Sequence, residues 1–434
     1  MELADFAKGA SIPLIQGGEV RVIEKLGEGG QGTVYRVFAE GQQYALKWYH
    51  KSALSDPKRF YNNLKSNIAK GAPTPAFLWP RFLTVPYDGS FGYVMELRPR
   101  QYRDFSDFLL AKTHFASVGA AVNAALNITN GFRELHRSGF SYQDLNDGNF
   151  FIDPATGDVL ICDNDNVAPY GENLGIAGKA RYMAPEVVRN IKRPDCMTDR
   201  FSLAVILFRL LFLDHPLEGK RLLCPCLTEE LELKYYGIDP VFIYDPRDDS
   251  NRPVRGVHSN VLRFWPLYPA FIKELFVRAF SKESMSGQVQ RVSDSEWQIA
   301  FTRLRDMLIT CPCSGDTFVD PDSPGSVCIN CGAKIPTPPV LYVKRSKVVL
   351  FPGKKLYRCH TRGDSDDYAS VTAEILRNNK RPDIWGLRNL TDGVWRYTDR
   401  SGAERLLAPG DVAIVTAIEH IHFDGCEGRV VYRQ

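Results

Sequence analysis

The chain has 434 residues, enough for two or three domains, and its 44% hydrophobic and 24% charged residues are typical of a soluble globular protein. Fifty-four basic against 51 acidic residues leave a net charge of +3, so nucleic acid and membrane surfaces are not expected as partners. The acidic start, Met1 to Asp5, has no apolar core and predicts no signal peptide. Ten cysteines without a secretion signal favour a reducing, cytoplasmic location and metal binding over disulfides.

Residues 20–96 alternate as β-strands do and contain one helix. Strands are predicted at 20–23, 34–38 and 43–49, the last two joined by a turn at Glu40-Gly41. The helix starts at Asp56-Pro57, because proline is tolerated in the first helical turn. Its apolar residues recur at every fourth position: Phe60, Leu64 and Ile68.

After Pro99 the pattern becomes mainly helical. Helices are predicted at 105–110, 118–136, 199–213, 268–280 and 294–309, with a short-strand region at 150–162. The apolar run 201–213 is too short and too interrupted to cross a bilayer. The last helix begins with a capping box, Ser293-Asp294-Ser295-Glu296. Residues 341–434 alternate apolar and polar residues between Gly and Asp turns, which predicts a small all-β module.

Four motifs follow one another in the order that phosphoryl transfer requires. They are Gly27-Glu28-Gly29-Gly30-Gln31-Gly32, Tyr44-Ala45-Leu46-Lys47, Asp144-Leu145-Asn146-Asp147-Gly148-Asn149 and Asp163-Asn164-Asp165. A G-x-G-x-x-G motif alone is weak evidence, and each residue alone is better explained as part of a hairpin or turn. The ordered set of four indicates a nucleotide site.

The first two motifs have the residues that ATP binding requires. Gly27, Gly29 and Gly32 let backbone amides approach phosphates without a Cβ in the way. Val34 and Ala45 are small apolar residues suited to sandwiching the adenine ring.

The remaining charged and amide groups have the chemistry of the transfer itself. Lys47 supplies a point charge for the α- and β-phosphates, and Asp144 would accept the proton of the substrate hydroxyl. Asn149 and Asp163 offer the hard oxygen ligands that Mg²⁺ prefers. The predicted cofactors of this site are therefore ATP and Mg²⁺.

On these motifs the chain resembles the eukaryotic-like Ser/Thr protein kinases over residues 20–310. Ala184-Pro185-Glu186 matches the motif that closes the activation segment, and Asp199 with 201–205 matches the start of the central C-lobe helix. Arg291 lies where the family has an arginine that pairs with the closing glutamate, here Glu186.

The resemblance implies an α+β, bilobal protein-kinase-like fold. A β-rich N-lobe would fill 1–97 and a helical C-lobe 98–310, with ATP between them. The hinge would be Glu96-Leu97-Arg98, with Met95 at the gatekeeper position, so these residues join the expected nucleotide site. The implied activity is transfer of the ATP γ-phosphate to a Ser or Thr hydroxyl of a protein substrate.

Several departures from the family pattern concern the activation segment. Where the family has His-Arg-Asp, this chain has Tyr142-Gln143-Asp144, so no arginine receives an activation-loop phosphate. Consistently, 163–186 contains no Ser or Thr. We therefore expect activity that does not depend on Ser/Thr phosphorylation of this loop.

Other departures change the charge of the site. The family's Asp-Phe-Gly is Asp163-Asn164-Asp165, without the apolar plug, and Asp165 is either a further metal ligand or a solvated loop carboxylate. The lysine expected two residues after the catalytic aspartate is Asn146, which removes one positive charge from the transition state. The hydroxyl residue expected after Gly178 is Lys179.

The partner of Lys47 is the most serious departure. The family uses a helix glutamate, yet no Glu occurs between Lys47 and Glu96. Asn63 and Asn67 lie at plausible helical positions, either to hydrogen-bond Lys47 or as surface amides, and neither supplies a countercharge. A nucleotide-binding pseudokinase scaffold therefore remains an alternative. A small-molecule phosphotransferase shares the Asp and Asn residues but typically lacks such a glycine loop and the Ala-Pro-Glu segment.

A cysteine-rich segment at 311–335 resembles a small zinc ribbon. Its ligands would be the two pairs Cys311, Cys313 and Cys328, Cys331, although the first pair is one residue shorter than usual. Free thiols are the alternative. Because protein ligands would fill all four positions, the Zn²⁺ would be structural, and it would supply folding energy that so short a segment lacks. Cys224 and Cys226 have no second pair nearby and are expected in an ordinary loop or core.

The module at 341–434 resembles a forkhead-associated (FHA) β-sandwich. The resemblance rests on 385–390, Trp395, Pro409-Gly410-Asp411 and Ile421-His422-Phe423. The usual Gly-Arg and Ser-x-x-His signatures are absent, so we expect an interaction module and make no prediction about phosphopeptide binding. Trp385 and Trp395 are expected in its core, and His136 is expected to be a packing residue.

The order of kinase, zinc ribbon and β-module resembles bacterial kinases associated with a PP2C-type phosphatase and with von Willebrand-type A-domain proteins in stress-response operons. The resemblance makes those proteins candidate partners, beside a protein substrate that the sequence does not identify.

Overall fold

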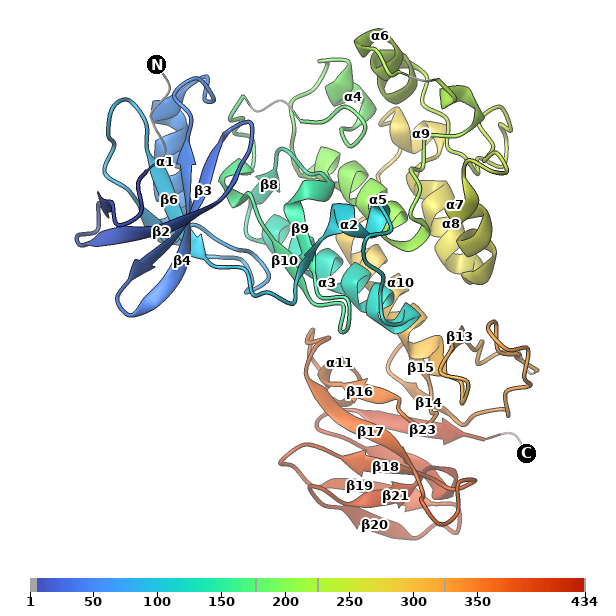
Figure 1. Ribbon diagram of the computed structural model, residues 1–434. Coiled ribbons are helices and arrows are strands. Elements are labelled where there is room, and N and C mark those ends of the chain that lie inside the picture. Colours follow the sequence, from blue (N-terminus) through green and yellow to red (C-terminus); the bar gives the residue numbers. More distant parts are fainter. Residues whose placement is uncertain (1–5, 176–177, 225, 324, 433–434) are drawn as a thin grey trace. The chain divides into compact units, whose positions relative to one another are not determined.

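The computed structural model describes residues 6–175, 178–224, 226–323 and 325–432 (Figure 1). The chain divides into two compact units. The first comprises 1–116, 123–265 and 273–297, and the second comprises 117–122, 266–272 and 298–434. Among the described residues, no helix is both long and apolar enough to traverse a membrane.

The first unit begins with an antiparallel six-stranded sheet in the order β1-β2-β3-β4-β6-β5. Its strands are β1 Ser11–Pro13, β2 Glu19–Glu28, β3 Gly32–Ala39, β4 Gln42–Tyr49, β5 Phe82–Leu83 and β6 Gly92–Glu96. The predicted turn between β3 and β4 is confirmed. Glu40 and Gly41 both have positive φ, 48° and 81°, as a two-residue hairpin turn requires.

Helix α1 (Pro57–Lys70) packs against this sheet, and Figure 1 shows it beside β6. Asp56 caps it by accepting a hydrogen bond from the Arg59 amide, so the predicted start is confirmed. Phe60 and Leu64 are buried in one apolar cluster with Tyr93 of β6. The helix ends at Gly71, whose φ of 78° is costly for any other residue.

The rest of the first unit is largely helical. Its short strands form two small sheets, β10-β9-β7 and β11-β8. They are β7 Arg103–Asp104, β8 Phe140–Tyr142, β9 Phe150–Ile152, β10 Val159–Ile161 and β11 Val167–Pro169. Of the longer helices, α5 Cys196–Phe212 lies wholly in this unit, whereas the division between the two units falls within α3 Val118–Arg137, α8 Ala270–Ala279 and α10 Asp294–Met307. The shorter helices are α2 Phe105–Leu109, α4 Pro185–Val188, α6 Glu229–Glu232, α7 Ser259–Phe264 and α9 Lys282–Met285.

Single helical turns complete this part of the chain. The 3₁₀ turns are η1 Asp147–Asn149, η2 Asn164–Asn166, η3 Lys220–Leu222 and η5 Trp265–Leu267, and η4 Leu233–Ile238 is a π-helix. The predicted capping box of α10 is confirmed, because Ser293 N donates to Glu296 at 2.8 Å and Glu296 N donates to Ser293 Oγ at 3.3 Å. The helix ends two residues earlier than predicted, since Leu308 already begins strand β12.

The second unit contains the predicted all-β module. Two antiparallel sheets, β15-β14-β23-β22-β19-β20 and β16-β17-β18-β21, share one apolar core. Trp395 is only 2% exposed and packs edge-on to Phe423 at 4.8 Å between ring centroids. Trp385 packs against the same core and against Phe351. Both tryptophans are thus packing residues, as expected.

The elements of the second unit, apart from the helices already given, are as follows: β12 Leu308–Thr310, β13 Asp316–Phe318, β14 Val340–Val343, β15 Ser346–Val349, β16 Lys355–Tyr357, α11 Arg358–Thr361, β17 Val371–Arg377, β18 Trp385–Asn389, β19 Trp395–Asp399, β20 Glu404–Leu407, β21 Val412–Ile414, η6 Val415–Ala417, β22 Ile418–His422 and β23 Glu427–Val431.

Candidate active site

The glycine motif forms the hairpin between β2 and β3. Glu28 pairs with Thr33 across the two strands, and Gly29 N donates to Gly32 O at 2.9 Å. Nothing lies within 4 Å of a Cβ built on Gly27 or Gly29, so their backbone is open to a ligand. Gly32 has a different role, because its Cβ would lie 2.2 Å from Trp48 O and would disrupt the pairing with β4.

The residues predicted to contact adenine lie in one apolar cluster. Ala45 and Met95 face each other across β4 and β6, and both are buried. Val34 and Leu97 pack against the same cluster, as does Phe151 of β9. The predicted hinge residue Glu96 is exposed at the end of β6 and forms an ion pair with Arg81, so its side chain points away from the cluster.

Lys47 on β4 points into a group of polar side chains. Its Nζ lies 2.8 Å from Asp165 Oδ2, 3.2 Å from Asp163 Oδ1 and 3.1 Å from the Gln31 amide oxygen. Burial alone lowers the pKa of Lys47, but the carboxylates of Asp165 and Asp163 together raise it above the ordinary value. The Lys47 side chain therefore stays protonated, and it lies between the glycine motif and the Asp163-Asn164-Asp165 motif.

Asp165 is fully buried and has a hydrogen-bond donor on each oxygen. Besides Lys47, Tyr49 donates to its Oδ2 at 2.5 Å and Tyr93 donates to its Oδ1 at 3.1 Å. The interpretation of Asp165 as a solvated loop carboxylate is therefore wrong. The sequence does not reveal this contact because the 3₁₀ turn η2 folds Asp165 back beneath β4, 118 residues away from Lys47 in the chain.

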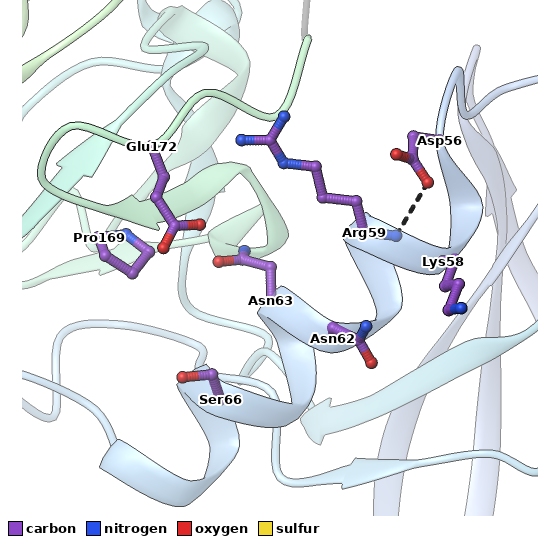
Figure 2. A pocket seen from close by; sticks show the side chains of 8 residues that line it. All are labelled: Asp56, Lys58, Arg59, Asn62, Asn63, Ser66, Pro169 and Glu172. Atoms are coloured by element: carbon purple, nitrogen blue, oxygen red, sulfur yellow. Dashed lines mark hydrogen bonds between the residues drawn. The ribbon is translucent and has the colours of Figure 1, made fainter.

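Neither alternative for Asn63 and Asn67, a hydrogen bond to Lys47 or a surface amide, agrees with the structure. Each side-chain amide donates to the backbone oxygen of Val167, in both cases at 2.8 Å. Both residues are buried, so they are not surface amides either. Figure 2 shows Asn63 directed toward Pro169 and Glu172, across an open polar pocket of about 590 Å³. The two asparagines attach α1 to β11, and Lys47 obtains its countercharge elsewhere.

The catalytic loop carries Asp144 and ends in the 3₁₀ turn η1. Asn146 caps this turn, and its backbone amide donates to Asn149 Oδ1 at 2.6 Å. Burial raises the pKa of Asp144, although the Asn146 side chain, hydrogen-bonded to it, and Lys179 oppose that rise. A carboxylate with a raised pKa is better suited to accept a proton near neutral pH.

Asp163 follows β10 in a left-handed conformation, with φ 54° and ψ 39°. This conformation is uncommon for a residue other than glycine and occurs often at functional sites. The preceding residue, Cys162, donates its amide to Asn149 O at 2.9 Å, so the two residues predicted to bind Mg²⁺ lie on adjacent segments. The Asp163 side chain is 40% exposed, which leaves carboxylate oxygen accessible to a metal ion. These oxygen donors fit Mg²⁺.

Asn164 replaces the aromatic residue of the family motif with a polar one. It is fully buried, and its side-chain amide donates to Leu78 O and Ile161 O, both at 2.9 Å. Hydrogen bonds rather than apolar packing therefore hold the segment that carries Asp163.

A buried ion pair supports the catalytic loop from below. Asp199 of α5 accepts a hydrogen bond from the Tyr142 amide at 2.7 Å and contacts His136 Nε2 at 3.2 Å. His136 Nδ1 contacts Asp294 at 2.9 Å. Burial lowers the pKa of His136, but the two aspartates raise it to about 9 overall. His136 is therefore a packing residue, as expected, but a charged one.

Two contacts hold the activation segment. The predicted pair between Arg291 and Glu186 is confirmed, with 2.8 Å between guanidinium nitrogen and carboxylate oxygen. The second contact involves Gln143, which stands where the family has an arginine and for which the sequence predicts no contact of its own. Its side chain donates to Glu172 O at 2.6 Å and accepts from Leu174 N at 2.8 Å. In the sequence, only the presence of a glutamine directly before Asp144 indicates that this second contact could form.

The four predicted zinc ligands come together in the second unit. Their sulfur atoms all lie within 4.8 Å of one another, as one metal ion requires. The backbone amide of Cys331 and the Thr317 hydroxyl lower the pKa of Cys328, which favours its thiolate, whereas contacts with other cysteine side chains raise the pKa of Cys331. Cys311 and Cys328 are buried in a cluster with Val349 and Phe351. The segment therefore shares a core with the β-module, which its length did not predict.

Comparisons with known proteins agree with this geometry. Residues 20–224 match the family described as protein kinase domain. A dual specificity protein kinase of Dictyostelium discoideum, shkB, is 26% identical over 268 residues, which cover 57% of this chain and 37% of that protein. A putative serine/threonine-protein kinase/receptor of Acanthamoeba polyphaga mimivirus, R831, is 25% identical over 212 residues, 46% of this chain and 13% of that protein.

The chain thus spans well under half the length of the curated relatives that it matches. Among solved structures, the PknI kinase domain of Mycobacterium tuberculosis aligns with a TM-score of 0.46 and 18% identity, over 69% of this chain and 99% of that one. The family match coincides with the segment that holds the lysine, the catalytic loop and the metal-type motif. Residues 20–224 are therefore similar to protein kinase domains.

Proposed function

We propose that the chain is an ATP- and Mg²⁺-dependent Ser/Thr protein kinase. One observation carries the proposal: Lys47 of β4 lies within hydrogen-bonding distance of Asp163, which adjoins the catalytic loop of Asp144 and Asn149. Phosphoryl transfer depends mainly on positioned charge, which Lys47, Asp144 and Asp163 supply, while Asn149 adds a neutral oxygen ligand. The match of residues 20–224 to the protein kinase domain family supports the same activity.

The residues have distinct roles in the proposed reaction. Lys47 binds and orients the α- and β-phosphates of ATP. The substrate hydroxyl oxygen attacks the γ-phosphorus, the bond from this phosphorus to the β-phosphate oxygen breaks, and ADP leaves with the electron pair. Asp144 accepts the hydroxyl proton. Mg²⁺, held by Asn149 and Asp163, would neutralise charge on the β- and γ-phosphates.

One of the arguments for the pseudokinase alternative is weakened by the contacts of Lys47. It was motivated by the missing helix glutamate, yet Asp165 contacts Lys47 at 2.8 Å and provides a countercharge from the other side of the site. A buried carboxylate with three donors is a fixed partner. The lysine therefore needs no movement of α1 to be neutralised and oriented.

We also propose that activation needs no Ser/Thr phosphorylation of the activation segment. In the family, an arginine before the catalytic aspartate pairs with a phosphate on this segment. Here Gln143 holds the backbone at Glu172 and Leu174 through two neutral hydrogen bonds. These bonds require no modification to form.

A transfer assay tests the activity. Purified protein is incubated with γ-labelled ATP and generic protein substrates, beside Asp144→Asn and Asp163→Ala. We expect each variant to lose about 10²–10⁴-fold in rate, which is the typical contribution of a general base or of a comparable group. Equal incorporation by wild type and Asp144→Asn would reject the kinase proposal in favour of the scaffold. Prior phosphatase treatment should not change the wild-type rate, and a loss of activity would overturn the proposed independence from loop phosphorylation.

For the second unit we propose a structural Zn²⁺ at the four cysteines and an interaction role for the FHA-like module. Four thiolates close the coordination of a single zinc ion. A PP2C-type phosphatase and von Willebrand A-domain proteins are the proposed partners, on the basis of domain order alone. Titration calorimetry of the purified chain with each of them tests this, and the absence of any binding heat would reject it.

A further inference from the structure

The activation segment brings a lysine against the catalytic loop. Lys179 Nζ lies 3.0 Å from Asn146 Oδ1 and 3.3 Å from Asp147 Oδ1. Asn146 in turn donates through Nδ2 to Asp144 Oδ1 at 3.1 Å. One side-chain amide therefore bridges the ammonium of Lys179 and the carboxylate that would accept the substrate proton.

The backbone of this segment also approaches the loop closely. A Cβ on Gly178 would lie 3.3 Å from Asp144 Oδ1, tighter than an ordinary contact. Glycine thus permits the approach that places the next residue, Lys179, beside the loop. Two contacts of Lys179, with Asn146 and Asp147, then fix the position of its long side chain.

The charge of Lys179 remains available to a ligand. Its side chain is 56% exposed. The carboxylate of Asp147 that it contacts is shared with Arg209, whose Nη1 lies 3.3 Å from Asp147 Oδ2. Because one carboxylate serves two cations, Asp147 only partly neutralises the charge of Lys179.

We propose that Lys179 is a catalytic residue that contacts the γ-phosphoryl group during transfer. This inference rests on the proposed kinase function. The chain has Asn146 where the kinase pattern has a lysine, and Lys179 supplies a cation to the same place from the activation segment. In the transition state negative charge spreads over the equatorial oxygens of the transferring group, and a fixed ammonium stabilises it there.

The test compares Lys179→Ala and Lys179→Arg with wild type. At saturating ATP we expect kcat of the alanine variant to fall about 10²–10³-fold, as for other fixed donors to developing charge. ATP affinity, measured by calorimetry, should not change, because Lys47 binds the α- and β-phosphates. The arginine variant keeps the charge and should retain most of the activity. Lys192→Ala is the matched control: this lysine pairs with Asp195 outside the site, and its removal should leave kcat unchanged.

The outcomes separate this inference from the kinase proposal. If Lys179→Ala has wild-type kcat while Asp144→Asn is inactive, the inference is wrong and the kinase proposal stands. If Lys179→Arg is as slow as Lys179→Ala, with thermal melts like wild type, the charge is not what matters and the inference is also wrong. Equal label incorporation by wild type and Asp144→Asn would reject the kinase proposal itself.

Discussion

Asp165 is the residue on which the arrangement around Lys47 depends most. A carboxylate removed from water is stable only when its charge is paired and its oxygens are hydrogen-bonded. Lys47, Tyr49 and Tyr93 satisfy both conditions. Because Asp165 and Asp163 belong to the same short turn, the position of the lysine and the position of the metal-type aspartate are coupled. In this site the countercharge and the predicted metal ligand come from one motif.

Replacing Asp165 by Asn should change how activity depends on pH. The substitution keeps the shape but removes one of two carboxylates that raise the pKa of Lys47, so burial should lower that pKa. The charged lysine is then lost as pH rises. We expect kcat/KM for ATP to fall about 10²-fold at neutral pH, and to decline further on the alkaline side where wild type does not.

Tyr93→Phe is the control for this prediction. It removes one hydrogen bond to Asp165 and leaves the carboxylate in place. Its pH profile should keep the shape of the wild-type profile. An Asp165→Asn profile parallel to that of wild type would show that Asp165 does not set the charge of Lys47.

At the scale of elements, α3, α5 and α10 are joined by the buried charges of His136, Asp199 and Asp294. Burial raises the pKa of Asp199 while the aspartates raise that of His136 to about 9, so the group as a whole retains its proton as pH rises. Because Asp199 also accepts the Tyr142 amide, the same contact supports the catalytic loop. The charge of His136 therefore affects both the stability of the first unit and the position of the loop that carries Asp144.

The stability of the first unit should consequently fall with rising pH. His136 has its ordinary pKa near 6.5 when unfolded and about 9 when folded. Its contribution is fully present below pH 6.5 and is lost progressively up to pH 9, by about 3 kcal/mol in total. Thermal unfolding followed from pH 6 to 9.5 measures this. His136→Gln should show a flatter profile, and identical slopes in both proteins would contradict the assignment.

The elements that the sequence predicted well are those governed by local rules. The Glu40-Gly41 turn needs positive φ, and the cap before Pro57 and the capping box at Ser293 each involve residues three positions apart. Helix α5 starts at Cys196 rather than at the predicted 199. Its cap is a second local signal, Asp195 with Thr198, which lies outside the apolar run used for the prediction.

The parts of the site that the sequence did not predict depend on contacts between distant segments. Asp165 meets Lys47, and Gln143 meets the backbone at Glu172, only after the chain has folded. A sequence motif assigns one role to each position. When another position supplies the same charge, the motif shows only that the usual residue is missing. Lys179, for example, stands where the family pattern has a hydroxyl residue, so the pattern indicates only that a hydroxyl is missing.

At the scale of the whole molecule, the second unit has an apolar core of its own. The zinc-type cluster is part of that core, since Cys311 and Cys328 pack with Val349 and Phe351. A metal there would connect two short segments of chain to the β-module. The free energy of unfolding of the second unit should therefore depend on the bound metal.

Metal removal tests this dependence. We expect one Zn²⁺ per chain by elemental analysis, and an unfolding midpoint of the second unit that falls by at least about 5 °C with chelator. Cys328→Ser should have the same effect without chelator. Cys224→Ser, which alters an exposed cysteine outside the cluster, should have none. Full stability in a protein free of zinc would contradict a structural metal.

The central claim is that Lys47 and Asp163 converge on one Mg²⁺-loaded triphosphate. Calorimetric titration with ATP, with and without Mg²⁺, measures this most directly. We predict that wild type binds ATP and binds it more tightly with Mg²⁺, and that Asp163→Ala loses the effect of the metal while Lys47→Ala weakens binding in both conditions. The claim would be contradicted if wild type gave no heat of association with ATP in either condition.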